Sequence, residues 1–320
     1  MDIHLFEKLR RAQVISDASL EKVKAVEKNR LFSLHWEIKT LLYLGVLLLS
    51  GGLGILVYKH IDTIGHQAIL ALIAAISTAC FAYCFRKARP FSWQKVASPN
   101  SFFDYALLLG CLTLITFIGY LQVQYTAFGN AYGLATFIPL AVLAFSAYYF
   151  DHLGVLSMAV VNLAAWVGVA IRPLELLHTW QFSAPVTIYT GAALGVFLLL
   201  AGELTQRKNL KAHFAFTYHN FGTHIFFLAC LAGMVQLDAI WVLLLAAMAA
   251  YVYQRAARER SFYFILITIL YAYVGLSYLV LRSLDHMKDL DAIYLGLFYF
   301  LFSALGVVLL LVHLNKKLRQ

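Results

Sequence analysis

The chain has 320 residues, of which 62% are hydrophobic and 13% are charged, and its formal net charge is +9. A soluble protein carries about 25% charged and about 45–50% apolar residues, so the excess apolar surface is expected to face lipid. This composition excludes a soluble nucleic-acid binder and a disordered chain, and 4 Cys in the whole chain are too few for a disulfide-stapled domain.

Residues 1–38 form the one sizeable segment that is predicted to lie outside the membrane. They are expected to form two short amphipathic helices that break near Ile15, the second of which is capped by Ser16 or Asp17. The apolar positions of the second helix recur at helical spacing and are Leu20, Val23 and Val26. Two functions stay open for this cytoplasmic segment, which either docks a protein partner or lies on anionic lipid headgroups.

The rest of the chain, residues 39–320, is predicted to be an all-α, polytopic transmembrane helix bundle of about ten spans, because it contains runs of about 17–25 mostly apolar residues. The first five spans are expected near 41–58, 67–85, 103–121, 131–150 and 153–171. The other five are expected near 183–202, 215–236, 239–254, 262–281 and 292–313. Two alternatives stay open: spans four and five form one re-entrant unit, or spans seven and eight do. Either would lower the number of spans by two and leave the basic loops on the same side of the membrane.

The basic residues alternate between the two sides of these spans. With the amino terminus in the cytoplasm, 21 of the 25 Lys and Arg residues fall on the cytoplasmic side. The four on the opposite side are Lys59, Arg172, Arg282 and Lys288. Because cytoplasmic loops carry the excess of Lys and Arg in membrane proteins, both termini are predicted to be cytoplasmic.

The order of motifs near the amino terminus points to a family. An Ile-Ser turn at Gln13-Val14-Ile15-Ser16 is followed by a basic stretch, and the glycine-rich apolar run from Leu44 to Gly54 then opens the many-helix region. Over about the first 90 residues this order resembles the bacterial membrane proteins of the domain-of-unknown-function family 2157. The resemblance implies a bacterial inner-membrane protein and brings no activity with it.

Ionisable residues within the spans are candidates for function, because each costs about 3 kcal/mol or more at the centre of a membrane helix. Asp104 lies at the edge of the third span, and Glu203 lies where the sixth span meets its basic loop. Each is either a proton or cation ligand at the cytoplasmic mouth or an interfacial carboxylate near the basic residues of its own loop, and the second interpretation is favoured. A proton-coupled carrier would be expected to have a carboxylate near mid-membrane, and none is evident.

Uncharged polar residues give further candidates for a ligand site or a polar network. Asn162 lies in the fifth span, and Tyr271 and Tyr278 lie in the ninth. A buried amide more often bonds a neighbouring helix, at about 0.6 kcal/mol on average, than a ligand. Two pairs of small residues, Ser50-x-x-x-Gly54 and Gly191-x-x-x-Gly195, are expected to let helices approach closely.

Histidines and cysteines do not predict a metal site. Between His213, His219 and His224, steps of six and five residues turn a helix by about 240° and about 140°, so neighbouring histidines share no face. Asp151-His152 is interpreted as a polar turn between the fourth and fifth spans and not as a catalytic dyad. No catalytic constellation appears, so the chain is expected to be no enzyme and to hold no cofactor.

Two hypotheses for the function remain. In the first, a non-enzymatic bacterial inner-membrane protein uses residues 1–38 and its basic loops to engage a protein partner or anionic lipid. In the second, the chain is a small-molecule or lipid transporter whose cavity is lined by Asn162, the tyrosines Tyr271 and Tyr278, and Asp104. The lipid bilayer is the expected partner in both, and nucleic acid is in neither.

Overall fold

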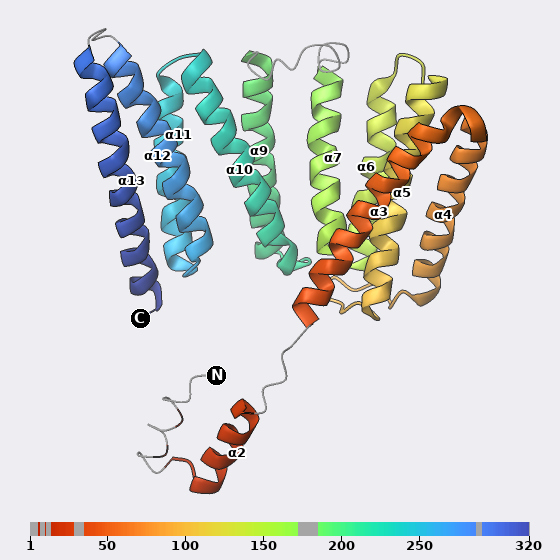
Figure 1. Ribbon diagram of the computed structural model, residues 1–320, viewed down its shortest axis with the longest axis horizontal. Helices are drawn as coiled ribbons and strands as arrows, with labels where there is room; N and C mark the ends of the chain where they lie inside the picture. Colours follow the sequence, from red (N-terminus) through yellow and green to blue (C-terminus); the bar gives the residue numbers. More distant parts are fainter. Residues whose placement is uncertain are drawn as a thin grey trace. The chain divides into compact units, whose positions relative to one another are not determined.

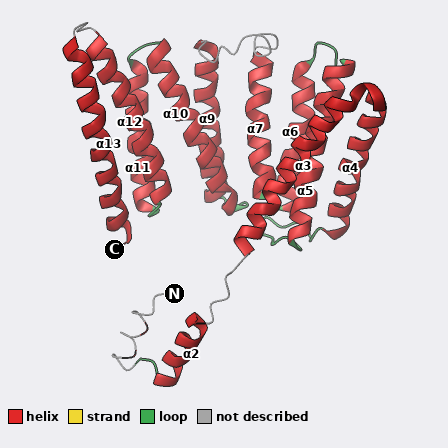
Figure 2. Cartoon of the chain, viewed as in Figure 1, coloured by secondary structure: helices red, strands yellow, loops and turns green. Residues whose placement is uncertain are grey.

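A computed structural model describes residues 6, 10, 14–28, 35–171, 185–285 and 290–319 of the chain. All regular structure in this part of the chain is helical, as predicted (Figure 2). The chain divides into two compact units, Met1–Leu56 and Val57–Gln320. Each unit is described by itself.

The first unit contains helix α2, Asp17–Lys28, and most of helix α3, His35–Ile64. The predicted cap of α2 is confirmed, because the Ser19 N–H donates to Ser16 Oγ at 3.2 Å. Leu20 on the predicted apolar face is buried. Most of the first predicted amphipathic helix lies outside the described residues. Helix α3 begins six residues before the expected start of the first span and continues beyond its expected end.

The second unit contains nine long helices in its described residues (Figure 1). The first four are α4, His66–Lys87, α5, Ser101–Tyr125, α6, Tyr132–Phe150, and α7, Leu153–Ile171. The other five are α9, Pro185–Arg207, α10, Ala215–Gln236, α11, Ile240–Arg258, α12, Phe262–Asp285, and α13, Leu290–Arg319. With α3, they overlap the ten predicted spans one for one.

Eight of these helices are long and apolar enough to cross a membrane by themselves in the described residues. The remaining two are α7, whose apolar stretch Leu153–Val169 is shorter, and α10. Helix α10 carries polar residues on several turns, among them His219 and His224. The structure therefore agrees with a polytopic membrane protein, and ten full crossings stay a prediction.

Helices α9 and α10 pack closely along their length (Figure 1). A Cβ atom built on Gly195 would lie only 2.8 Å from the Phe226 Cβ and 2.9 Å from the Phe226 backbone nitrogen. On Gly191 it would lie 3.6 Å from the Ala229 Cβ. The predicted close approach at Gly191-x-x-x-Gly195 is confirmed. The core beside it is formed by buried residues of α9 to α12, including Ile188, Phe227, Cys230, Trp241 and Ile265.

Three connections of the second unit meet at one end of its helices. The Lys211 N–H donates to the Trp93 carbonyl at 2.8 Å, which joins the α9–α10 connection to the α4–α5 connection. The Val96 N–H donates to Asp151 Oδ2 at 2.5 Å, which adds the α6–α7 turn. These connections were all assigned to the same side of the membrane from the sequence, and the structure brings them together.

Candidate polar site at the ends of α9, α10 and α11

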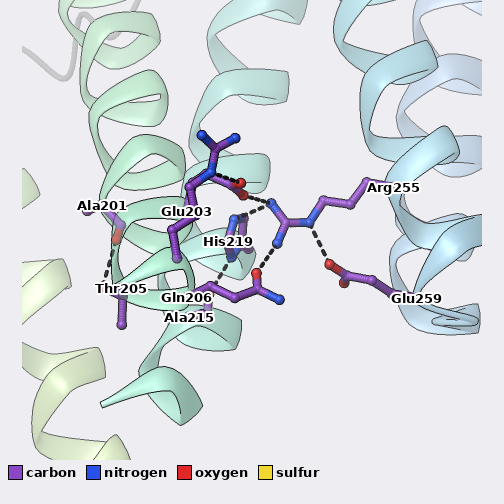
Figure 3. Close-up of polar contacts among 9 residues, drawn as sticks. Ala201, Glu203, Thr205, Gln206, Ala215, His219, Arg255 and Glu259 are labelled. Carbon is purple, nitrogen blue, oxygen red and sulfur yellow. Dashed lines mark hydrogen bonds and ion pairs between the residues drawn. The ribbon is translucent and has the colours of Figure 1, made fainter. Parts of the chain in front are cut away.

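The Arg255 guanidinium, in the last turn of α11, is the centre of a polar network (Figure 3). Its Nη1 lies 3.0 Å from Glu203 Oε2 on α9, and its Nη2 donates to Gln206 Oε1 at 2.6 Å. Its Nε donates to Glu259 Oε1 at 2.9 Å. The planar fork of an arginine can satisfy several acceptors at once, so one side chain joins the ends of α9 and α11.

The fourth partner of Arg255 is His219 of α10, whose Nε2 lies 2.5 Å from Arg255 Nη1 (Figure 3). The Nδ1 atom of the same ring lies 2.6 Å from the Ala215 carbonyl oxygen. Guanidinium groups only donate and carbonyl groups only accept. The two contacts therefore assign the proton to Nδ1, with Nε2 as an acceptor, in an uncharged ring.

The ring of His219 fits there because Gly202 of α9 has no side chain. A Cβ atom at Gly202 would lie 2.6 Å from His219 Cε1. Glu203 follows directly and also accepts from Arg207 Nε at 2.7 Å, one helical turn further along α9. Glu203 is thus a carboxylate paired with a basic residue of its own helix end, as the favoured interpretation of the sequence has it.

A polar pocket of about 500 Å³ opens beside this network. It is lined by Glu203, Gln206, Arg207, Tyr251, Gln254, Arg255, Arg258 and Glu259. Both carboxylates in the wall are paired with arginines. Arg207 and Arg258 are exposed, and with three arginines and two glutamates the lining carries a net charge of +1.

A second polar cluster is centred on Asp151, which ends α6 in the left-handed conformation with φ of 58°. Asp151 Oδ2 lies 3.1 Å from Lys211 Nζ, and these side chains are 1% and 0% exposed. Asp151 Oδ1 lies 2.5 Å from His213 Nε2. The Lys211 ammonium also lies 5.4 Å from the centre of the Phe91 ring. The expected polar turn at Asp151 is therefore part of a buried ion pair.

The residues predicted as ligand candidates have separate surroundings. Asp104, in the first turn of α5, accepts from Ser98 Oγ at 3.1 Å and lies 3.8 Å from His152 Nε2. The Asn162 side-chain nitrogen in α7 is buried and has no hydrogen-bond partner in the described part of the chain.

The two tyrosine candidates lie on α12. The Tyr271 hydroxyl lies 2.9 Å from His224 Nδ1 on α10. Tyr278 lines an open groove of about 970 Å³ together with Arg282, Asp285 and apolar residues of α10, α12 and α13. Asp104 and Asn162 are on α5 and α7, so the structure does not gather the four candidates around one described pocket. Asp104 and Tyr271 have hydrogen-bond partners, whereas the Asn162 side-chain nitrogen has none in the described residues.

Arg255, the central residue of the site, was not predicted as a site residue from the sequence, where it counted only among the basic residues that orient the helices. The available signal was the i, i+4 spacing of Arg255 and Glu259 and of Glu203 and Arg207 at the ends of two apolar helices. Within the described residues, no group of three or more His, Cys, Asp or Glu side chains could hold a metal ion. His213, His219 and His224 have Asp151, Arg255 and Tyr271 as their respective partners.

Comparison with protein families shows where the chain is similar to others. Residues 7–156 match DUF2157, a family of predicted membrane proteins. The resemblance stated from the sequence is confirmed, and it extends beyond the first 90 residues to the start of α7. No curated protein and no solved structure matches the chain. Asp104 and Asp151 lie within the DUF2157 region, whereas the Arg255 network lies outside it.

Proposed function

We propose that this chain is a non-enzymatic protein of the bacterial inner membrane that binds anionic lipid headgroups at its cytoplasmic face. The DUF2157 match and the long apolar helices support its place in a membrane. The distribution of 21 of 25 Lys and Arg residues to one side supports cytoplasmic termini. The cytoplasmic leaflet is the one rich in anionic lipid, and each nearby Lys or Arg adds about 1 kcal/mol of attraction to it.

The observation that carries this proposal is the pocket beside Arg255. Glu203 pairs with both Arg255 and Arg207, and Glu259 pairs with Arg255, so two of the three arginines in the wall are offset and the exposed Arg258 supplies the remaining positive charge. Guanidinium groups suit phosphate oxygens in both charge and geometry. The pocket lies at helix ends, which is the depth at which phospholipid headgroups are found.

Residues 1–38 are proposed to add a second contact with the same surface. Helix α2 places Leu20 on a buried face, while Lys22 and neighbouring positions are exposed. An amphipathic helix with basic residues on its polar face lies in the plane of anionic membranes. A protein partner that binds residues 1–38 is the alternative for this segment.

Native mass spectrometry of the full chain, extracted gently from its membrane, tests the proposal. We expect retained phosphatidylglycerol or cardiolipin in preference to phosphatidylethanolamine, and about fivefold less of it in an Arg258→Gln variant. Arg86→Gln removes the same charge from the exposed end of α4 and is the matched control. Equal retention in Arg258→Gln and the wild type, or an equal loss in Arg86→Gln, would reject the pocket as the headgroup site.

The same spectra separate the other hypotheses. A stoichiometric protein that is lost when residues 1–38 are deleted would favour the docking function of that segment. A co-purifying small molecule that is lost in Asn162→Leu would favour a transporter. The transporter hypothesis draws on the unpartnered side-chain nitrogen of Asn162 and on the groove beside Tyr278.

A further inference from the structure

The start of α7 is tied to the α9–α10 connection at one end of the second unit. The tie is the buried pair of Asp151 and Lys211, whose charged atoms are 3.1 Å apart. Tyr148 of α6 and Tyr218 of α10 add a hydroxyl-to-hydroxyl contact of 2.8 Å just beyond it. At this end the DUF2157 helices and the later helices are therefore held together.

A cavity of about 510 Å³ lies between the same helices at their other ends. It is lined by the second half of α7, the first half of α9 and the second half of α10. The lining residues on α7 are Ala164, Val167 and Gly168, and those on the other two helices include Thr187, Thr190, Gly191, Ile225, Leu228 and Ala232. Because α7 starts and α9 ends at the Asp151 tie, this cavity lies in the opposite half of the membrane-spanning region.

The lining of the cavity is apolar. Small residues, Gly168, Gly191 and several alanines, leave the space between the helices. The Thr190 hydroxyl donates to backbone carbonyl groups of its own helix, with 3.2 Å to Thr187 O, and is not free to bind a polar solute. Leu228 lines the cavity and is 57% exposed, so the cavity is continuous with the outer surface of α10.

The position of the cavity decides what can fill it. An empty space of this size forfeits dispersion contacts along its whole lining, and water is stable only where it finds two to four polar partners. Helix α10 is one of the ten predicted spans, and hydrocarbon is the medium next to the exposed side of a membrane-spanning helix. The volume lies within the roughly 300–1,000 Å³ of small-ligand pockets, which is large enough for part of an acyl chain.

We propose that this cavity holds an acyl chain of a phospholipid from the leaflet opposite the Asp151 tie. The chain enters past Leu228 and packs against the glycines and alanines of α7 and α9. The site is independent of the headgroup pocket beside Arg255, which lies at the other end of the helices. It makes a lipid acyl chain a component of the contact between the DUF2157 region and the helices that follow it.

Photolabelling of the full chain in nanodiscs tests the proposal. The probe is a phosphatidylethanolamine with a diazirine near the end of one acyl chain, and adducts are mapped by peptide mass spectrometry. We expect adducts concentrated on the lining segments of α7, α9 and α10. In an Ala164→Leu, Ala232→Leu variant these adducts fall by about tenfold, because the added methyl groups occupy the space.

The matched control is Ala165→Leu, which adds the same group at an exposed position next to Ala164. It leaves the adducts on the lining segments unchanged. Adducts spread evenly over the lining and the exposed face of α13 in the wild-type protein would overturn the proposal without any variant. So would lining adducts that persist at the wild-type level in a folded, monodisperse Ala164→Leu, Ala232→Leu protein.

Discussion

The ion pairs of this protein differ in how deeply their charged side chains are buried. The Asp151 and Lys211 side chains are 1% and 0% exposed, whereas Arg207 in its pair with Glu203 is 75% exposed. An exposed pair is worth about 0–1 kcal/mol. Removing one partner of a buried pair leaves an uncompensated charge, which costs about 3–5 kcal/mol.

Lys211→Met therefore tests the Asp151 tie. We expect a loss of about 3–5 kcal/mol in the free energy of unfolding, measured by denaturant titration in mixed micelles, because the Asp151 carboxylate stays buried without its cation. The double variant Asp151→Asn, Lys211→Met is expected to recover part of this loss. Lys208→Met, an exposed position in the same connection, is the control and is expected to match the wild type. A Lys211→Met protein as stable as Lys208→Met would show that the pair contributes nothing.

The Arg255 network differs from the Asp151–Lys211 pair because several side chains share its charges. Four partners from α9, α10 and α11 surround one half-buried guanidinium. Glu203 has Arg207 as a second partner, so it does not depend on Arg255 alone. The central arginine holds the helix ends together, and Arg258 carries the positive charge of the pocket that the two carboxylates leave uncompensated.

Helix α9 packs closely on helix α10. Gly191 and Gly195 share a face of α9 and differ in what a methyl group would meet there. At Gly195 the neighbours include the backbone of Phe226, which cannot move away without shifting α10, whereas the nearest atom at Gly191 is a side-chain carbon at 3.6 Å.

Gly195→Ala is expected to destabilise the protein by about 1–3 kcal/mol, since the helices must separate to accept the methyl group. Gly191→Ala is the matched substitution on the same face and is expected to be neutral or slightly stabilising, because alanine favours the helix and fits the space. The midpoint of thermal unfolding in detergent measures both. Equal midpoints for the two variants would contradict close backbone contact at Gly195.

At the scale of the whole molecule, the number of membrane crossings is the main structural prediction. Ten crossings place Phe128, in the α5–α6 connection, and Asp238, between α10 and α11, on the side opposite Lys208 and Arg260. Single cysteines at these positions, in a background with the four native cysteines replaced by alanine, report their side through a membrane-impermeant thiol reagent.

We expect cysteines at 128 and 238 to react from the periplasmic side and those at 208 and 260 only after the membrane is opened. This pattern follows from cytoplasmic termini and an even number of crossings. If α10 and α11 formed one re-entrant unit, position 238 would not react from the periplasm while 128 still would. Reaction of 208 from the periplasm would reverse the whole orientation.

Local patterns along the chain predicted the helices of this protein. Apolar runs located ten long helices, and Ser16, one of the two residues predicted to cap α2, is the observed cap. The Gly191–Gly195 contact was predicted from local spacing, whereas a Cβ atom at Gly54 of the other predicted pair would have no neighbour within 4 Å in the described residues. The motif order also indicated the family over the first part of the chain. These features depend on residues within a few positions of one another, and such patterns are visible along the chain.

Which polar residues meet depends on how distant helices pack. Arg255 contacts Glu203 and His219, which are 52 and 36 positions away, and Lys211 contacts Asp151 across 60 positions. All of these residues lie at helix ends, where basic and acidic residues also serve orientation and capping, so their types did not mark them as partners. The ligand candidates were chosen because polar groups are costly in lipid, yet the structure leaves them on different helices, with partners for Asp104 and Tyr271 and none in the described residues for the Asn162 side-chain nitrogen. The free-energy cost of a polar group in lipid identifies which groups need a partner. The packing of distant helices decides which of them find one.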